Sequence, residues 1–305
     1  MRRARFAAAL VALGLIGSTP ALAQHIDLGD LVGKAKNARG ALHTIGEAEE
    51  VKIGGNLAGL ILGAAPLVNN PAEQRYVNAV GRWLSLHCER PGLPWKFGVI
   101  DTTDVNAFSA PGGYVLISQG LFDRLRNASE LAAVLAHEIA HVVRKHHLKA
   151  LQHGMGNALF GDVGQALTGG QGGLTGALTS GLINGGRGMF IRGLDKEDEF
   201  EADRLAVIIA ARSGYSPYGM VGVLQTISAA PAQGAFAQMF ATHPPAADRI
   251  ERLGNAMGNR LDSLTGLVDD AQSFVDLRNM PPPPAPAPPP LPKTSPLLRK
   301  HPHSG

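Results

Sequence analysis

Residues 131–141 read Leu-Ala-Ala-Val-Leu-Ala-His-Glu-Ile-Ala-His, and we expect the domain to form around this segment. The first six residues are apolar, which favours a helix that is buried in the core. Imidazole and carboxylate groups are costly to bury, so their presence in such a helix calls for a specific role. His137 and His141 are four residues apart, which places both rings on one face of a helix.

This spacing is typical of a zinc site. Two imidazoles one helical turn apart can bind the same Zn²⁺ ion, and Glu138 then lies beside the water on the metal and can take its proton. We call this pattern, His-Glu-x-x-His, the HExxH motif. Its three fixed residues occur at this spacing by chance in roughly one chain in a hundred of this length. The apolar flank adds weight, so we predict His137 and His141 as metal ligands and Glu138 as the catalytic base.

A catalytic zinc site also needs a third protein ligand and one open position. One candidate is His147, six residues after His141, a spacing that zinc proteases with three histidine ligands combine with a glycine turn. Arg144 stands at that turn here, and a continuous helix would rotate His147 away from the face of His141. We therefore expect His146 and His147 to be solvated at the end of the helix, which should run from the capping residue Asn127 to about residue 152.

The other candidate is the segment Glu199-Phe200-Glu201-Ala202-Asp203. Glu199 and Asp203 share a helical face, and the small Ala202 and Ala206 would let this helix approach the HExxH helix closely. Glu199 could bind zinc while Asp203 accepts a hydrogen bond from a ligating histidine. Alone, the segment would fit a solvated, acidic helix start equally well. Beside the HExxH motif, we favour the ligand interpretation.

Composition and charge narrow the class of protein. The chain has 305 residues, of which 45% are hydrophobic and 17% charged, as in globular proteins. Without Arg2, Arg3 and Arg5, which belong to a predicted signal peptide, 25 basic residues equal the 25 acidic ones. This balance argues against a nucleic-acid partner, which needs clustered positive charge. The single cysteine, Cys88, excludes an intrachain disulfide framework and a multi-cysteine zinc site.

The N-terminus has the features of a cleavable signal peptide over residues 1–23. Its basic start is followed by the apolar run 6–16, which falls short of the roughly 18 residues that cross a bilayer, and by Ala21-Leu22-Ala23, a small-x-small cleavage signal. No cysteine follows that would carry a lipid anchor. We predict export to the periplasm, with residues 24–46 as an N-terminal leader.

Two segments differ in composition from the rest of the predicted domain, residues 47–278. Residues 154–193 hold 14 glycines in 40 positions, and we interpret them as a flexible insertion; a mobile lid or a peripheral membrane contact is the alternative. Residues 280–305 hold 11 of the 21 prolines, which predicts an extended, disordered tail from about residue 279. Short strands are expected at 97–100 and 114–117, with Gly112-Gly113 as the turn before the second.

The order of these motifs resembles the HtpX and CAAX prenyl protease type 1 family of zinc metallopeptidases. The HExxH motif is followed by Glu199-x-x-x-Asp203 and then by Thr242-His243-Pro244-Pro245, with Arg249 six residues after the histidine. The chain is most similar to the exported BepA-like and LoiP-like members and to the peptidase domain of mitochondrial Oma-type proteases. The resemblance spans roughly residues 47–261. The helical repeat domain of BepA-like members has no counterpart in it, so a role that depends on those repeats is not implied.

The resemblance implies an α+β, mainly helical zincin (gluzincin) domain with a small sheet, whose edge strand would be residues 114–117 and would bind extended peptides. By carry-over, the implied zinc ligands are His137, His141 and Glu199, with Asp203 supporting a ligand and Glu138 activating water. Three further residues would lie near the oxyanion: Asn106, His243 and Arg249. Without the resemblance, His243 would be an ordinary turn residue and Asn106 a loop amide.

The expected function is that of a zinc-dependent endopeptidase, which hydrolyses misfolded or unassembled cell-envelope proteins by Glu-assisted attack of zinc-bound water. The alternative is a latent or weakly active member that acts as a chaperone-like binder of the same proteins. A purely structural zinc site is disfavoured, because two histidines and one glutamate leave a coordination position open. We expect His243 either to stabilise the oxyanion or to occupy that open position as a gate.

Overall fold

The computed structural model describes residues 45–151 and 193–279. The predicted signal peptide, nearly all of the leader, all of the glycine-rich insertion except Gly193, and the proline-rich tail of residues 280–305 lie outside these ranges, so those expectations stay predictions. Among the helices in the described ranges, none is both long enough and apolar enough to cross a membrane.

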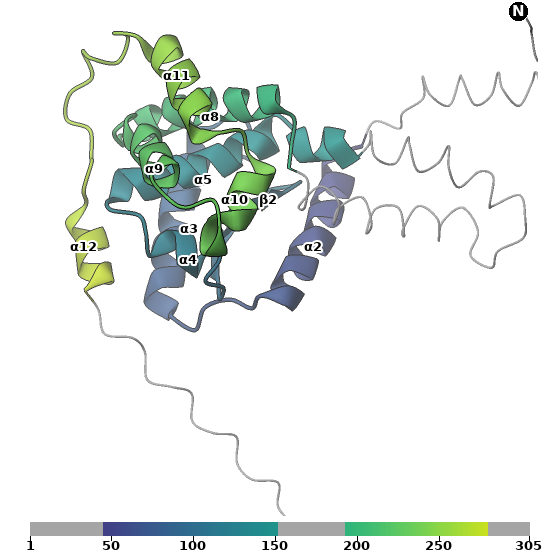
Figure 1. Cartoon of the computed structure of the whole chain (residues 1–305). Helices are drawn as coiled ribbons and strands as arrows, with labels where there is room; N and C mark the ends of the chain where they lie inside the picture. The colour runs from purple at the N-terminus through teal and green to yellow at the C-terminus, as the bar shows by residue number, and fades with distance from the viewer. Residues whose placement is uncertain (1–44, 152–192, 280–305) are drawn as a thin grey trace, which may run out of the picture. The chain divides into compact units, whose positions relative to one another are not determined.

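Helices dominate the described chain, as predicted (Figure 1). The helices are α2 (Glu47–Ala64), α3 (Pro71–Leu86), α4 (Gln119–Phe122), α5 (Ala128–Val143), α8 (Lys196–Arg212), α9 (Gly219–Ser228), α10 (Ala237–Thr242), α11 (Ala246–Met257) and α12 (Gln272–Arg278), with a short 3₁₀ helix at Gly234–Phe236. The strands are β1 (Lys96–Ile100), β2 (Ala107–Ala110) and β3 (Tyr114–Ser118). The predicted α+β, mainly helical architecture with a small sheet is confirmed.

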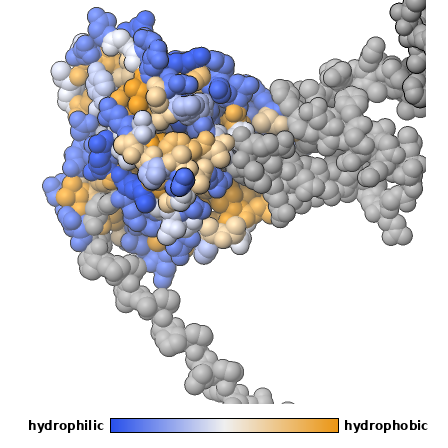
Figure 2. Space-filling view, viewed as in Figure 1, coloured by the Kyte–Doolittle hydropathy of each residue, from blue (hydrophilic) through white to orange (hydrophobic). Residues whose placement is uncertain are grey.

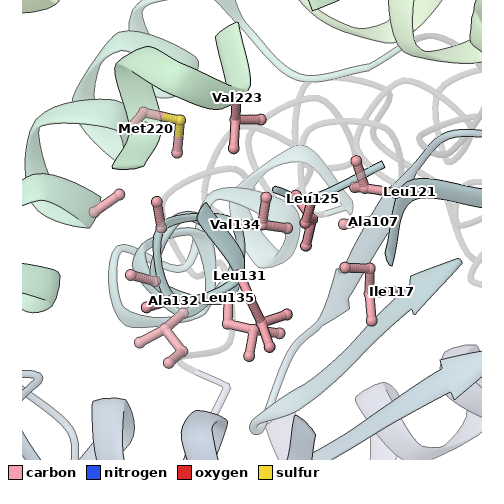
Figure 3. Close-up of a cluster of buried hydrophobic side chains, with 14 of the residues drawn as sticks. Ala107, Ile117, Leu121, Leu125, Leu131, Ala132, Val134, Leu135, Met220 and Val223 are labelled. Carbon is pink, nitrogen blue, oxygen red and sulfur yellow. The ribbon is translucent and has the colours of Figure 1, made fainter. Parts of the chain in front are cut away.

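Helix α5 is the buried centre of the domain, which explains the apolar run of residues 131–136 in its sequence. Figure 3 shows its side chains between those of α9, such as Met220 and Val223, and those of the sheet, such as Ala107 and Ile117. Leu131 of α5 is fully buried in this cluster. Burial of a leucine contributes roughly 1.5 to 3 kcal/mol, so the apolar half of α5 anchors the helix that carries the histidines.

The start of each key helix is fixed by its own sequence. The side-chain oxygen of Asn127 accepts a 2.9 Å hydrogen bond from the backbone N–H of Glu130, which caps α5 as predicted. Asp195 caps α8 in the same way through the N–H of Glu197, at 3.0 Å. Both caps satisfy an N–H group that the first helical turn cannot pair internally.

The sheet has the order β1-β3-β2, with β1 parallel and β2 antiparallel to β3. The expectation that residues 114–117 form the edge strand is therefore wrong: β3 is central, and β1 and β2 are the two edges. The glycines of the tight turn, Gly112 and Gly113, adopt positive φ angles of 77° and 100°, and this turn folds β2 back onto β3. Strand β2 is only four residues long and rich in small residues, so its sequence carried little strand signal.

Helix α5 ends at Val143, so the predicted continuation to residue 152 is also wrong. Arg144 and Lys145 form a turn, Lys145 has a φ of 58°, and helical structure resumes over residues 146–151. Ion pairs hold the turn: Lys145 Nζ lies 3.4 Å from Glu50 Oε2, and Arg144 Nε lies 3.0 Å from Glu201 Oε1. A lysine thus adopts the left-handed conformation that usually requires glycine.

Candidate functional site

The three predicted ligand residues converge where α5 packs against α8. The Nε2 atoms of His137 and His141 are 3.0 Å apart, and the carboxylate oxygens of Glu199 lie 3.6 Å and 3.5 Å from them. A tetrahedral zinc ion with bonds of about 2.0 to 2.1 Å separates its ligand atoms by about 3.3 Å. These residues form a group that could hold a metal ion, with all three side chains buried. Ala202 and Ala206 are fully buried, as expected for helices in close contact.

The donor set fits a divalent cation chemically as well as geometrically. Glu199 Oε2 is buried and has no hydrogen-bond partner within the described chain. Burial alone would raise the pKa of Glu199, but the neighbouring His243, His141 and His137 hold it well below its usual value. A buried, ionised carboxylate facing two imidazole nitrogens is the arrangement that a bound zinc ion satisfies.

Asp203 contacts the ring nitrogen of His137 that faces away from the ligand group. Its Oδ1 lies 3.1 Å from Nδ1 of His137, so the opposite nitrogen, Nε2, points toward Glu199. Arg249 on α11 donates to both carboxylate oxygens of Asp203, from Nε at 2.8 Å and from Nη2 at 2.6 Å. Burial alone would lower the pKa of His137, but its contacts with Asp203 and Glu199 outweigh burial and raise the pKa of the metal-free ring to about 9. The solvated alternative for the acidic segment is wrong at Glu199 and Asp203, both only 1% exposed.

Glu138 lies next to the ligand group and is buried beside strand β2. Its Oε2 accepts a 2.6 Å hydrogen bond from the hydroxyl of Ser109. Burial raises the pKa of Glu138 above its ordinary value, which suits a group that must accept a proton. Ser109 was missed by sequence reasoning because β2 itself was not foreseen; the Phe108-Ser109 pair before a Pro-Gly-Gly turn was the available signal.

A small opening of about 40 Å³ leads to this group. Its lining comes from β2 and the residue before it, from α5 and the helical segment 146–151 after it, from α8 and the residues before it, and from the end of α10. The lining residues are Asn106, Ala107, Phe108, Ser109, Glu138, His141, His147, Gly193, Leu194, Glu199, Thr242 and His243. His243 Nε2 lies 3.6 Å from Glu199 Oε2, and His243 Nδ1 lies 2.9 Å from the hydroxyl of Thr242. Asn106 is buried, and its side-chain oxygen accepts from the N–H of Ala107 at 3.0 Å.

Arg249 lies behind the ligands rather than on this lining. Its Nη1 is 4.0 Å from Glu199 Oε2, and its other donors are engaged by Asp203. The oxyanion roles of Asn106, His243 and Arg249 stay predictions. For Arg249, the contacts favour an electrostatic role through Asp203.

His146 and His147 are not solvated, contrary to expectation: they are 0% and 8% exposed. The turn at Arg144 and Lys145 carries both rings back to the site. His146 Nδ1 lies 3.0 Å from Nδ1 of His141, and the ring of His147 lies 5.4 Å from that of His141. Sequence reasoning missed them because it required a glycine at the turn.

The chain is similar in sequence to known proteins. The profile described as Peptidase family M48 matches residues 71–257. The chain is 32% identical over 227 residues to the beta-barrel assembly-enhancing protease of Escherichia coli K12, which covers 72% of this chain and 45% of that protein. It is 30% identical over 168 residues to metalloprotease LoiP of Escherichia coli K12, which covers 54% of this chain and 64% of LoiP. It is 25% identical over 166 residues to mitochondrial metalloendopeptidase OMA1 of Arabidopsis thaliana, which covers 54% of this chain and 32% of OMA1.

Proposed function

The chain belongs to peptidase family M48, and from this premise we propose that it is a zinc-dependent endopeptidase that hydrolyses misfolded or unassembled cell-envelope proteins. The observation that carries the proposal is the convergence of His137, His141 and Glu199, at 3.0 to 3.6 Å from one another, beside the buried carboxylate of Glu138. A metal cofactor is implied by the family and by this group of ligands. Zinc is our specific assignment, because two imidazoles and one carboxylate are a frequent ligand set of catalytic zinc.

Different residues of the chain have separate roles in the proposed hydrolysis. When bound, a zinc ion would polarise the scissile carbonyl and lower the pKa of the attacking water. Ser109 engages Oε2 of Glu138, so Oε1 is the oxygen that we expect to receive the proton of that water. As the hydroxyl adds to the carbonyl carbon and the C–N bond breaks, Glu138 delivers this proton to the leaving nitrogen. Asp203 and Arg249 keep His137 oriented throughout.

We propose that an extended substrate binds alongside β2. This strand is an edge of the sheet, and Phe108 and Ser109 line the opening. A peptide can join such an edge through main-chain hydrogen bonds, which are indifferent to its side chains. Asn106 and His243 flank the same opening; we propose that Asn106 stabilises negative charge on the carbonyl oxygen and that His243 either shares this role or occupies the open coordination position.

The surface around the opening has apolar residues that suit the binding of unfolded proteins. Figure 2 shows apolar residues gathered near the middle of this face, at the place of α10 in Figure 1, with hydrophilic residues around them. Helix α10, with the sequence Ala-Gln-Met-Phe-Ala-Thr, leads directly into His243. Helix α10 exposes Ala237 and Ala241 and leaves Phe240 half-buried, whereas Met239 is buried, and we propose that this small apolar surface contacts the apolar segments that unfolded proteins expose. We place the protein in the periplasm on the strength of the predicted signal peptide.

The test uses the purified full chain without its signal peptide. We expect one zinc per chain by elemental analysis, cleavage of an unfolded protein such as reduced casein, and loss of cleavage on chelation. Glu138→Gln should keep fold and zinc but lose about 10²- to 10⁴-fold in turnover, because an amide cannot accept the proton. Full turnover in Glu138→Gln, with contaminating proteases excluded, would contradict the mechanism.

The same variant separates the alternative function. If the protein is a chaperone-like binder, the wild-type chain and Glu138→Gln should suppress the aggregation of an unfolded protein equally well, and neither should cleave it. If the protein acts as a peptidase in cells, the wild-type gene should complement a deletion of the gene, and the Glu138→Gln variant should not.

A further inference from the structure

We propose that His146 is a positioning residue that fixes the second zinc-binding histidine, His141, and is itself held by carboxylates of α8. This inference rests on the metal site of the proposed function. His146 is fully buried, and its Nδ1 lies 3.0 Å from Nδ1 of His141. Its other nitrogen, Nε2, lies 3.3 Å from Glu201 Oε2 and 3.4 Å from Asp198 Oδ1.

The protonation states follow from the position of each nitrogen. Nε2 of His141 faces His137 and Glu199, so a metal bound there uses the lone pair of that atom. The proton of the neutral ring must then be on Nδ1, which becomes a donor. Nδ1 of His146 lies opposite and must accept, so the proton of His146 resides on Nε2. This N–H points at Glu201 and Asp198, which only accept. All four ring nitrogens are thereby satisfied in one chain of bonds.

A second cation site is the competing interpretation of the same cluster, because His146, Asp198 and Glu201 present ligand atoms close together. A cation on Nε2 of His146 would need the lone pair of that nitrogen and would move the proton to Nδ1. Two N–H groups would then face each other at 3.0 Å. Glu201 also pairs with Arg144, at 3.0 Å from Nε, which competes with a cation for the carboxylate. The hydrogen-bonded chain is therefore favoured over a second ion.

The arrangement gives the two ligand histidines matching supports from one helix. Asp203 of α8 holds Nδ1 of His137 directly, at 3.1 Å, whereas Glu201 of α8 holds Nδ1 of His141 through the ring of His146. Partners of this kind fix ring orientation, and their loss typically weakens metal binding or activity about 10- to 100-fold.

The experiment measures zinc affinity by competition with a chromophoric chelator, together with the melting temperature of the metal-free protein. His146→Leu keeps the bulk of the ring but cannot accept from His141, and we expect zinc to bind about 10- to 100-fold more weakly. His146→Gln supplies an amide oxygen in its place and should recover part of that loss. The control, His87→Leu, changes a histidine whose ring contacts Trp83, away from the site, and should leave zinc affinity unchanged.

The Asp198→Asn/Glu201→Gln double variant replaces the two half-buried carboxylates that face His146 by amides and also removes the ion pair of Glu201 with Arg144; it should weaken zinc binding several-fold in the same direction. A lower melting temperature with unchanged zinc affinity in His146→Leu would reduce His146 to a packing residue and overturn the inference. Two zinc ions per wild-type chain, with only the second lost in His146→Leu, would overturn it in favour of the cation site. A wild-type chain that binds no zinc would overturn the proposed function and this inference with it.

Discussion

Ser109 on strand β2 donates a 2.6 Å hydrogen bond to the carboxylate of Glu138 on helix α5. Both groups are buried, so water does not compete for the contact. The bond ties the base of the proposed reaction to the strand along which the substrate is expected to lie. A substrate that shifts β2 would therefore shift the base with it.

Ser109→Ala removes this bond and should lower kcat by about tenfold, because a hydrogen bond to a charged group is worth roughly 1.5 to 3 kcal/mol and part of that orients the base. Zinc content and KM should change little. Ser85→Ala is the matched control: this buried serine donates to the backbone of Arg82 within α3, away from the site. Equal kcat for the two variants would mean that Ser109 does not orient Glu138.

Arg249→Met should destabilise the protein by about 3 to 5 kcal/mol, because it leaves the buried charge of Asp203 without its partner. The free energy of unfolding from urea denaturation measures this loss. The Arg249→Met/Asp203→Leu variant removes both charges and should recover most of the stability while zinc binding stays weak. A stable single variant with normal zinc affinity would show that this pair is dispensable.

His243→Ala should raise basal proteolysis and slightly weaken zinc retention. The reason is that Nε2 of His243 lies 3.6 Å from Glu199, the same separation that Nε2 of His137 keeps from it. From there the ring can occupy the open coordination position and exclude water. Turnover of casein and zinc content report the result. A fall in turnover with zinc retained would instead support the oxyanion role.

Gly193→Ala should destabilise the segment next to His243. Gly193 has a φ of +76°, and an added Cβ would lie 1.9 Å from the carbonyl oxygen of Thr242. Strain at such a position costs about 1 to 3 kcal/mol, measurable by urea unfolding, and the displaced Thr242 should alter turnover. Gly59→Ala is the control, because that helical glycine has open space around it and alanine should stabilise α2 by roughly 0.5 to 1 kcal/mol. Similar effects at both positions would contradict the steric argument.

The buried carboxylate of Glu50 predicts a pH dependence of stability. Burial raises its pKa, but Arg90, the N–H of Gly112 and Lys145 outweigh burial and lower the pKa below 4.5 in the folded protein. The stabilisation is therefore complete above pH 4.5 and is lost as the pH falls through the folded-state pKa.

Glu50→Gln should lower the free energy of unfolding by about 3 kcal/mol at pH 7 and flatten its acid dependence, since it breaks the buried pair with Arg90. Glu47→Gln, at an exposed carboxylate 3.4 Å from the same arginine, should cost well under about 1 kcal/mol. Parallel unfolding curves for wild type and Glu50→Gln between pH 3 and pH 7 would contradict the assignment.

Local sequence signals predicted the parts of the fold that depend on neighbours in the chain. The apolar run at the start of α5 and the cap at Asn127 belong to this class, as does the i, i+4 pair of histidines. Strand β2 was missed because three of its four residues, Ala107, Ser109 and Ala110, are small and have little strand preference of their own; pairing with β3 makes the strand.

The turn at Lys145 was missed for a different reason. Its left-handed backbone is unfavourable for lysine locally, by about 1 to 2 kcal/mol. Ion pairs to Glu50 and Glu201, far away in the sequence, offset that cost. The left-handed conformation of Lys145 thus turns the chain so that His146 and His147 face the site and not water.

The position of Glu199 on α8, about 60 residues after the HExxH helix, also sets when the protein becomes active. Early in synthesis, the emerging chain carries both histidines but lacks the carboxylate that completes the ligand set. Metal capture then coincides with the docking of α8 on α5, because the site does not exist before that event. The proposed hydrolysis therefore cannot begin before α8 has docked on α5, so a chain that still lacks α8 should be inactive.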